Sequence, residues 1–244
     1  MQIQNLFQRL WQSGKSLYYR KYRAGESSWS QCGEDRVMDY LACVILKIPS
    51  PTYLDIGAHQ PWYLSNTALF YSKGSQGYLI EPDKSLAAKL RQERPRDTVY
   101  EFGIAKESGR LEFFQMSEPT LNTMSETEAI RMEKMGLTIV AKSHIQVVGI
   151  NELLVEMKIK CWPDILSLDV EGLDLEIVEA VDFSQSGPKL ICLETVAYDP
   201  ISGKKDTRLA DILKTKGYLQ VADTWINSIF VQERLWSTLH NSDR

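Results

Sequence analysis

The chain has 244 residues, of which 43% are hydrophobic and 25% are charged, and its formal net charge is −4 at pH 7. This length suits one large α/β domain or two small ones, and the composition is that of a soluble globular protein. The net charge argues against a nucleic-acid partner. The four cysteines lack the spacing of a zinc site, and the sequence shows neither a membrane-spanning apolar run nor a secretory signal. We therefore expect a cytoplasmic protein.

Residues 1–29 differ from the rest of the chain and are predicted to form a basic, helical N-terminal extension. The first 25 residues contain five basic side chains and no acidic one, and their apolar residues recur at roughly helical spacing. We favour a helix that caps the main domain or makes a dimer contact. A basic amphipathic helix at a membrane surface is the alternative. Peripheral membrane contact through residues 1–25 and a homo-oligomer therefore both stay open.

Residues 30–244 alternate strand patterns with helix patterns, which predicts a mostly parallel sheet with helices on its faces. The stretch 117–144 is polar, and we interpret it as a mobile insertion that acts as a lid or a substrate loop. The predicted helices span 34–47, 64–73, 84–92, 151–157, 173–180 and 206–216, and the predicted strands span 53–56, 77–81, 98–102, 111–115, 145–148, 165–169, 190–194, 218–223 and 227–231.

The last two predicted strands are only a few residues apart, so they must pair as an antiparallel hairpin. A mostly parallel α/β sheet that ends in such a hairpin is typical of the Rossmann-like class I methyltransferase fold. A dinucleotide-binding Rossmann domain normally ends in parallel strands. The topology therefore favours the methyltransferase fold.

Two successive predicted strands end in a carboxylate, which indicates a nucleoside-binding edge of the sheet. Asp55 lies at the end of the first strand and is followed by Gly57, whose backbone can approach a ligand closely. Glu81 ends the second strand, where a carboxylate can accept hydrogen bonds from both ribose hydroxyls. The separation suits one strand, one crossover helix and the next strand. An adenosine-type cofactor is predicted, and an ordinary strand-to-loop exit after Asp55 is the alternative.

The glycine pattern narrows the choice of cofactor. The G-x-G-x-x-G fingerprint is absent, because Gly57 is followed by Ala-His-Gln-Pro. No second or third glycine is present to receive a pyrophosphate. The sequence therefore favours S-adenosylmethionine, which has a ribose but no phosphate bridge.

Several short motifs together resemble the FkbM-type methyltransferases. The resemblance covers about residues 30–231, and the family's Gly-Ala-Asn-x-Gly turn is replaced here by Gly-Ala-His-Gln-Pro. It implies methyl transfer from S-adenosylmethionine, most often to an oxygen of a sugar or another natural product, and hence a small-molecule or glycan acceptor. The motifs are Ser30–Asp35, Asp55–Ala58 with Ser65–Thr67, Ile80–Asp83, Leu121–Ser125, Ser167–Gly172 and Pro188–Glu194.

The positions of these motifs imply a cofactor-binding set. Gly57 and Ala58 would lie against the methionine part of the cofactor, and Asp55 would hold its ammonium group directly or through water. Glu81 would bind the ribose, and adenine would lie at Asp83 and a turn at 102–105. The full set is Asp55, Gly57, Ala58, Asn66, Glu81, Pro82, Asp83, Gly103, Ile104 and Ala105.

Three acidic residues are candidates for the chemistry. Methyl transfer is an in-line displacement at a sulfonium carbon, so the acceptor oxygen must be held in line and lose a proton. Asp169 is expected beside the transferable methyl group, Glu171 follows on the same loop, and Glu194 ends the neighbouring strand. One of them would be the general base; alternatively, Asp169 and Glu194 would bind Mg²⁺, so the metal is left undecided. For Glu171, an acid favoured by a helix N-terminus is an equal alternative.

Other residues and other functions carry weaker signals. His59 is either a base or a residue that stabilises the cofactor turn. Trp62, Tyr63 and Tyr198 are either sugar-stacking groups or ordinary core and rim residues. A nicotinamide-dependent oxidoreductase is disfavoured by the missing glycines. A non-catalytic cofactor-binding module of the same fold stays open as an alternative function.

Overall fold

The computed structural model describes residues 28–195 and 207–241. The predicted basic stretch 1–25 and Tyr198 lie outside the described residues. Among the described helices, none combines the length and the apolar character that crossing a membrane requires.

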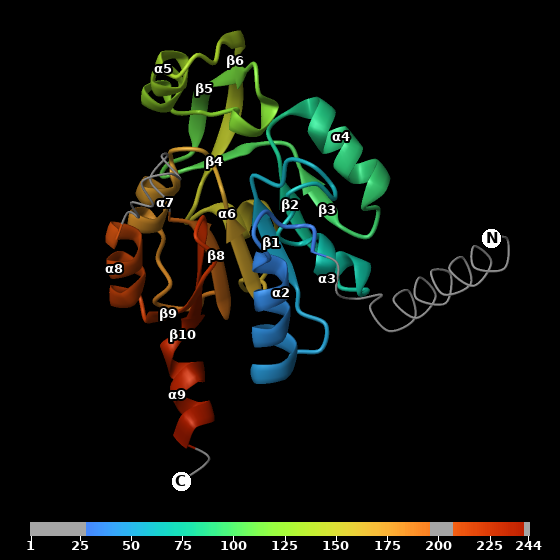
Figure 1. The fold of residues 1–244 in the computed structure, drawn as a ribbon, viewed down its shortest axis with the longest axis vertical. Coiled ribbons are helices and arrows are strands. Elements are labelled where there is room, and N and C mark those ends of the chain that lie inside the picture. Colours follow the sequence, from blue (N-terminus) through green and yellow to red (C-terminus); the bar gives the residue numbers. More distant parts are fainter. Residues whose placement is uncertain (1–27, 196–206, 242–244) are drawn as a thin grey trace, which may run out of the picture.

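A seven-stranded sheet forms the centre of the molecule, in the order β3-β2-β1-β7-β8-β10-β9 (Figure 1). The strands from β3 to β8 pair in parallel, and β10 is antiparallel to both β8 and β9. The predicted parallel sheet with a C-terminal antiparallel hairpin is thus confirmed. Its strands are β1 (Tyr53–Ile56), β2 (Gly77–Ile80), β3 (Thr98–Tyr100), β7 (Ile165–Leu168), β8 (Leu190–Glu194), β9 (Tyr218–Asp223) and β10 (Asn227–Gln232).

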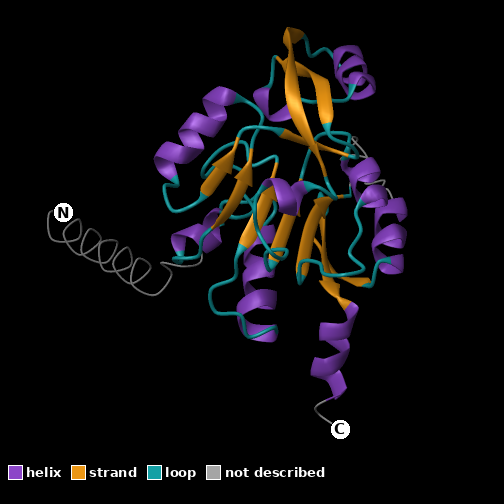
Figure 2. Ribbon diagram, turned by 180° about the vertical axis from the view of Figure 1, so that it is seen from behind, coloured by secondary structure: helices purple, strands orange, loops and turns teal. Residues whose placement is uncertain are grey.

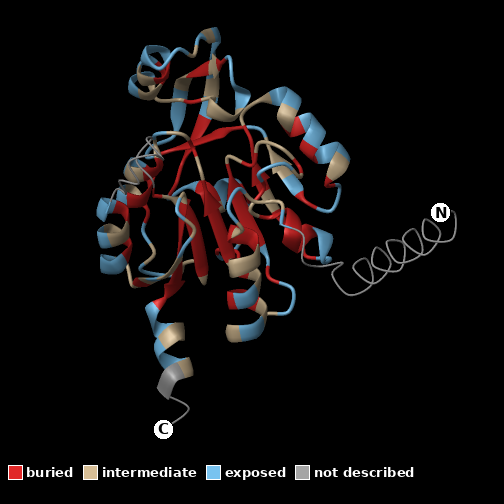
Figure 3. Ribbon diagram, viewed as in Figure 1, coloured by how far each residue is buried: buried red, intermediate tan, exposed pale blue. Residues whose placement is uncertain are grey.

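The central strands are buried on both faces, which explains their continuous apolar runs. Side chains alternate across a strand, so Tyr53 belongs to one core cluster and its neighbour Leu54 to the other. Leu190 and Ile191 of β8 divide in the same way. The burial view shows these strands as the buried centre of the ribbon (Figure 3).

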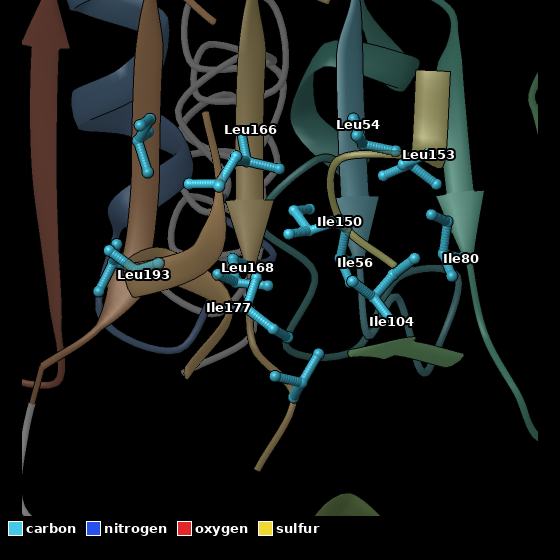
Figure 4. Close-up of a cluster of buried hydrophobic side chains, with 14 of the residues drawn as sticks. Leu54, Ile56, Ile80, Ile104, Ile150, Leu153, Leu166, Leu168, Ile177 and Leu193 are labelled. Carbon is cyan, nitrogen blue, oxygen red and sulfur yellow. The ribbon is translucent and has the colours of Figure 1, made fainter. Parts of the chain in front are cut away.

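Helices cover both faces of this sheet (Figure 2). One group packs on the cluster that contains Tyr53, and the other packs on the cluster that contains Leu54, where Leu153 and Ile177 meet the strand residues (Figure 4). The helix α9 (Glu233–Asn241) follows β10 and extends from one end of the molecule (Figure 1). The first group is α2 (Glu34–Asp39), α3 (Ala68–Ser72) and α4 (Lys84–Glu93), and the second is α6 (Leu153–Glu156), α7 (Asp174–Ala180) and α8 (Thr207–Thr215).

A second sheet of three strands, in the order β4-β6-β5, stands at the end of the molecule opposite α9 (Figure 1). Its elements are β4 (Gly103–Ala105), β5 (Gly109–Met116), a 3₁₀ turn (Pro119–Leu121), α5 (Glu126–Lys134) and β6 (Ile139–Gly149).

The stretch 117–144, which we interpreted as a polar and mobile insertion, contains regular secondary structure that we did not predict. That stretch contains α5 and more than half of β6. A small core holds it together, in which Ala129 and Met132 of α5 pack on Phe114 and Met116 of β5. The sequence hid this helix because only two of its residues are buried and its outward face is polar. A role as a lid stays a prediction.

Three predicted elements differ in detail. The helix predicted at 34–47 changes at Tyr40 into a π-helical segment, Tyr40–Ile45. The helix predicted at 64–73 begins only at Ala68, because Leu64 has a φ of 55° and cannot be helical. The turn predicted at 102–105 is instead the strand β4, which pairs in parallel with β6.

Candidate active site

A cavity of about 190 Å³ opens at the C-terminal ends of β1, β2 and β7, where open α/β sheets bind their ligands. Its opposite wall comes from β4, β5 and the segment 119–124 of the second sheet. The predicted residues that line it are Asp55, Gly57, Ala58, Asn66, Glu81, Pro82, Gly103, Ile104, Asp169 and Glu171. Three others, Asp83, Ala105 and Glu194, do not line the cavity.

Gly57 lies where the loops after β1 and β7 meet. It has a φ of +83°, and an added Cβ would lie 1.8 Å from the backbone oxygen of Asp169. The backbone N–H of Asp169 donates to the carbonyl of Ile56 at 3.0 Å. Only glycine fits this position. We predicted that the Gly57 backbone approaches a ligand closely. In the structure it approaches the loop after β7, and this contact holds the turn after β1 next to Asp169.

Asp55 is buried and is held by the loop that precedes α3. Its Oδ2 accepts a hydrogen bond from Thr67 Oγ1 at 2.6 Å. The neighbouring Asn66 donates from Nδ2 to Ser167 Oγ at 3.2 Å, so this loop spans both β1 and β7. Burial raises the pKa of Asp55, against the opposing effects of the Thr67 hydrogen bond and the Arg94 charge. A carboxylate so placed gains from a cationic ligand in the cavity.

A fully buried arginine, Arg94, forms hydrogen bonds to the loop that precedes α3. Its Nε donates to Asp97 Oδ2 at 2.8 Å, and its Nη2 donates to Tyr53 Oη at 3.1 Å and to Thr67 Oγ1 at 3.0 Å. Its Nη1 donates to Ser65 Oγ at 3.3 Å and reaches the carbonyl of Pro61 at 3.5 Å. All five N–H donors of the guanidinium are thus used. This one side chain thus contacts three residues of the segment 61–67, in addition to the bonds from Asn66 and Thr67 to the strands.

Glu81 lies at the tip of β2 and is 5% exposed. Its two carboxylate oxygens accept backbone hydrogen bonds from His59 at 2.9 Å and Asp83 at 2.8 Å. Burial raises the pKa of Glu81 to about 7, although these two bonds oppose the shift. Each oxygen keeps lone pairs for a further donor. The ribose-binding role of Glu81 stays a prediction; in the structure its carboxylate joins the loops after β1 and β2.

His59 adopts a φ of 48° in the turn after β1 and lines the cavity. Its buried Nε2 has no hydrogen-bond partner among the described residues. Burial lowers the pKa of His59, so the ring is neutral at physiological pH. One ring nitrogen of a neutral imidazole is a donor and the other an acceptor. Nε2 is therefore available to a polar group of a bound ligand.

Two of the residues assigned to adenine binding have other places. The Asp83 side chain caps α4, accepting from the backbone N–H of Ser85 and Leu86, and it also accepts from Gln115 Nε2. Ala105 is buried in β4 outside the cavity wall. Their positions do not support the predicted contacts with adenine. Gly103 and Ile104 do line the cavity.

Asp169, Glu171 and Glu194 come together beside the cavity. Leu168 of β7 pairs with Leu193 of β8, so the next residues along the two strands are Asp169 and Glu194. One oxygen of each of the three carboxylates lies within 4.8 Å of the others. Glu171 has a φ of 50°, and its carbonyl accepts a hydrogen bond from Thr123 Oγ1 of the second sheet. The candidates predicted from three separate sequence positions thus form one cluster.

Burial and mutual repulsion make these carboxyls hard to ionise. Burial, with the charge of Asp55, raises the pKa of Asp169 to about 6. Burial, with the charge of Asp169, raises the pKa of Glu194 to about 9 and that of Glu171 well above its ordinary value. Buried Asp174, at the start of α7, has a pKa raised to about 7 for the same reasons. The cluster therefore has a strong tendency to hold protons or to bind a cation.

Several cavity residues carried no assigned role at the sequence level. Gln31 lies in the Ser30–Asp35 motif, which docks on β10 because Glu34 accepts from Thr224 Oγ1 at 2.7 Å and Asn227 Nδ2 at 2.9 Å. Asn122 and Met124 lie in the quoted Leu121–Ser125 motif, so a signal existed for them. No sequence signal pointed to Asn227, because this residue reaches the cavity through the antiparallel pairing of β10 with β8.

Comparison with known families agrees with this geometry. The family model described as the methyltransferase FkbM domain matches residues 55–219, which is more than half of the chain. The chain belongs to this family. The match contains Asp55, Glu81 and the complete Asp169, Glu171 and Glu194 cluster. No curated protein sequence matches the chain.

Three solved structures with similar folds are distant from this chain in sequence. A methyltransferase FkbM from Methylobacillus flagellatus is 18% identical with a TM-score of 0.41, and the alignment covers 75% of this chain and 43% of that protein. A TehB-like SAM-dependent methyltransferase from Corynebacterium glutamicum is 10% identical with a TM-score of 0.45, covering 90% and 97%. Fibrillarin from Aeropyrum pernix, solved with S-adenosylmethionine bound, is 10% identical with a TM-score of 0.39, covering 74% and 65%.

Proposed function

We propose that this FkbM-family protein transfers a methyl group from S-adenosylmethionine to a hydroxyl oxygen of a sugar or another small natural product. The observation that carries the proposal is the contact between Gly57 and the backbone of Asp169. This contact supports the proposal because it brings the loop after β1 next to Asp169, which lines the same cavity as Glu171 and clusters with Glu194.

The residues present fit the proposed cofactor. Asp55 offers a buried carboxylate to the ammonium group, and Glu81 offers free lone pairs to the ribose hydroxyls. The positive sulfonium is compatible with a cavity whose charged lining residues, Asp55, Glu81, Asp169 and Glu171, are all acidic. Ile104 and Leu86 supply apolar surface on the side of the cavity next to the second sheet.

The chemistry needs a proton acceptor next to the acceptor hydroxyl. When bound, the cofactor supplies an electrophilic methyl carbon on sulfur; the C–O bond forms as the C–S bond breaks. Asp169 has a pKa raised to about 6, so it is mostly ionised at pH 7 and still basic enough to accept the hydroxyl proton. Thr123, which is bridged to Phe114 of β5, donates a hydrogen bond to the carbonyl of Glu171 and so ties the loop after β7 to the second sheet.

The proposal is tested first by cofactor binding. We expect calorimetry to show binding of S-adenosylhomocysteine, and we expect Glu81→Gln to weaken it about 10- to 100-fold, because an anionic acceptor is lost. The matched control is Glu101→Gln, which removes an acid paired with exposed Arg91 outside the cavity. Its affinity should equal that of the wild type. Equal affinity in folded Glu81→Gln would remove Glu81 from the binding site.

Turnover is tested with S-adenosylmethionine carrying a tritiated methyl group and a panel of sugars and polyhydroxylated natural products. We expect label in the acceptor, stable to base as an ether is. Asp169→Asn should reduce turnover about 10²- to 10⁴-fold with little change in cofactor affinity. Cofactor binding without methyl release on any acceptor of the panel would favour a non-catalytic binding module. Label on nitrogen or carbon would contradict the O-methyl assignment.

A further inference from the structure

The acidic cluster beside the cavity has the geometry of a chelate. Asp169 and Glu171 lie on the loop after β7, and Glu194 ends the adjacent strand β8. Three carboxylate oxygens, one from each residue, lie within 4.8 Å of one another. A cation placed between them could contact all three, because oxygen ligands lie about 2.0–2.6 Å from Mg²⁺ or Ca²⁺.

A second observation concerns one atom of the cluster. Asp169 Oδ1 is buried and has no hydrogen-bond partner among the described residues. Buried carboxylate oxygens are nearly always satisfied, and leaving one without a partner is costly. This oxygen belongs to the same residue that supplies a chelating oxygen to the cluster. This oxygen can therefore accept a bond from a ligand, and a cation at the cluster would satisfy it.

The side-chain charges around the cluster are mostly negative. Asp55, Asp174 and Glu128 act on it electrostatically in addition to its own three acids. Arg131 acts on Glu194 with the opposite sign, but its guanidinium also forms a two-point ion pair with Glu128. One arginine is thus set against several carboxylates, and further positive charge at the cluster would be stabilising.

We infer that Asp169, Glu171 and Glu194 form a binding site for a divalent cation such as Mg²⁺ or Mn²⁺. All three ligands are hard oxygen donors, which suit these ions and not soft metals. Three monodentate carboxylates fill half of an octahedral shell and leave positions open toward the cavity, which Asp169 and Glu171 both line.

The cation would set the class of acceptor, and this consequence rests on the proposed function. Open positions next to the transferred methyl group can hold two oxygens of one acceptor molecule. The acceptor should therefore present a chelating pair, such as two neighbouring hydroxyls or a hydroxyl next to a carbonyl. Coordination would also lower the pKa of the hydroxyl that is methylated. The proton of that hydroxyl would pass to a carboxylate of the cluster or to water.

The cation site is tested without cofactor or acceptor. Full-length protein freed of metal is titrated with Mn²⁺, and the free ion is followed by electron paramagnetic resonance. We expect one saturable site, with Mg²⁺ competing for it. Glu194→Gln should weaken Mn²⁺ binding at least about tenfold, the usual effect of losing a charged ligand.

The matched control is Glu112→Gln, which removes an acid that pairs with Lys142 outside the cavity. It lowers the net negative charge by the same amount and should bind Mn²⁺ as the wild type does. Circular dichroism checks that both variants are folded. If Glu194→Gln is misfolded, Asp169→Asn is measured in its place.

The inference is overturned if the wild type shows no saturable Mn²⁺ site at millimolar concentration, or if folded Glu194→Gln binds as tightly as Glu112→Gln. Because these measurements need no turnover, they are independent of the methyltransferase assay. Mn²⁺ binding without methyl transfer would keep the site and reject the proposed function. Methyl transfer that is unchanged by EDTA, in a protein that shows no saturable Mn²⁺ site, would keep the proposed function and reject the cation site.

Discussion

Single residues at this site serve both the fold and the cavity. Gly57 allows the turn after β1 to touch the loop after β7, and Glu81 joins two loops while it faces the cavity. Substitutions here should therefore change stability and binding together. The effect on binding must be measured on protein that is shown to be folded.

Gly57→Ala is expected to be severe. Its Cβ would lie 1.8 Å from a backbone oxygen that cannot move freely, and its φ of +83° is strained for alanine. We expect a loss of about 3 kcal/mol or more in the free energy of unfolding, measured in urea, because a backbone clash is added to left-handed strain. Gly74→Ala is the control: φ is +99°, but no atom lies within 4 Å of its Cβ. The explanation fails if the two variants lose equal stability.

The sequence pointed to residues that line the cavity where a side chain follows a strand, and it missed residues whose burial depends on distant partners. Asp55, Glu81 and Asp169 could be found because apolar runs mark the strands before them. Arg94 could not be found in this way, because the charged residues around it in the sequence are typical of a surface segment. In the structure Arg94 is buried and bonds to Asp97 and Tyr53.

At the scale of elements, one buried ion pair connects the end of α4 to β1, to the start of β2 and to the segment 61–67. Arg94 and Asp97 lie after α4, and their partners lie on β1 and in the segment 61–67. Asp97 also accepts from the backbone N–H of Gly77 at the start of β2. The pair thus fixes the loop before α3 relative to the sheet.

Arg94→Met should cost about 3–5 kcal/mol of unfolding free energy, because it leaves Asp97 charged and without its buried partner. Arg91→Met, in the last turn of α4, removes an arginine paired at the surface with Glu101, and it should cost less than about 1 kcal/mol. Urea denaturation of both proteins measures the difference. A small loss in Arg94→Met would mean that Asp97 is satisfied by its other donors.

The elements differ in how well the sequence predicts them. β1, β7 and β8 are continuous apolar runs, and their predicted bounds agree with the structure to within one residue. In the second sheet, β5 and the end of β6 were predicted, but β4, α5 and the first part of β6 were missed. Only a few residues of α5 and β6 are buried, and the core of this sheet is small. The cavity needs both sheets, so its outer wall could not be derived from strand patterns alone.

On the scale of the whole molecule, the acidic residues around the cavity repel one another when they are ionised. Glu81 and Asp174 have pKa values raised to about 7, and the pKa of Glu194 is raised to about 9, above ordinary values of 4.5, 3.8 and 4.5. The folded protein therefore binds more protons than the unfolded chain between about pH 4 and pH 9. Hydrogen bonds act oppositely elsewhere: against burial, they lower the pKa of Glu34 and Asp164.

These shifts predict how stability depends on pH. Because the folded state holds the extra protons, the free energy of unfolding should fall as pH rises from about 5 to 9. It should also fall below about pH 4, where Glu34 and Asp164 are protonated and lose their native hydrogen bonds. Thermal melts of the ligand-free protein across this range should show highest stability near pH 5. Glu194→Gln removes one of the raised groups, so its melting temperature should decline less between pH 6 and 9. A wild-type melting temperature that rises steadily from pH 5 to 8 would show that the acids around the cavity are not repelling one another in the ligand-free state.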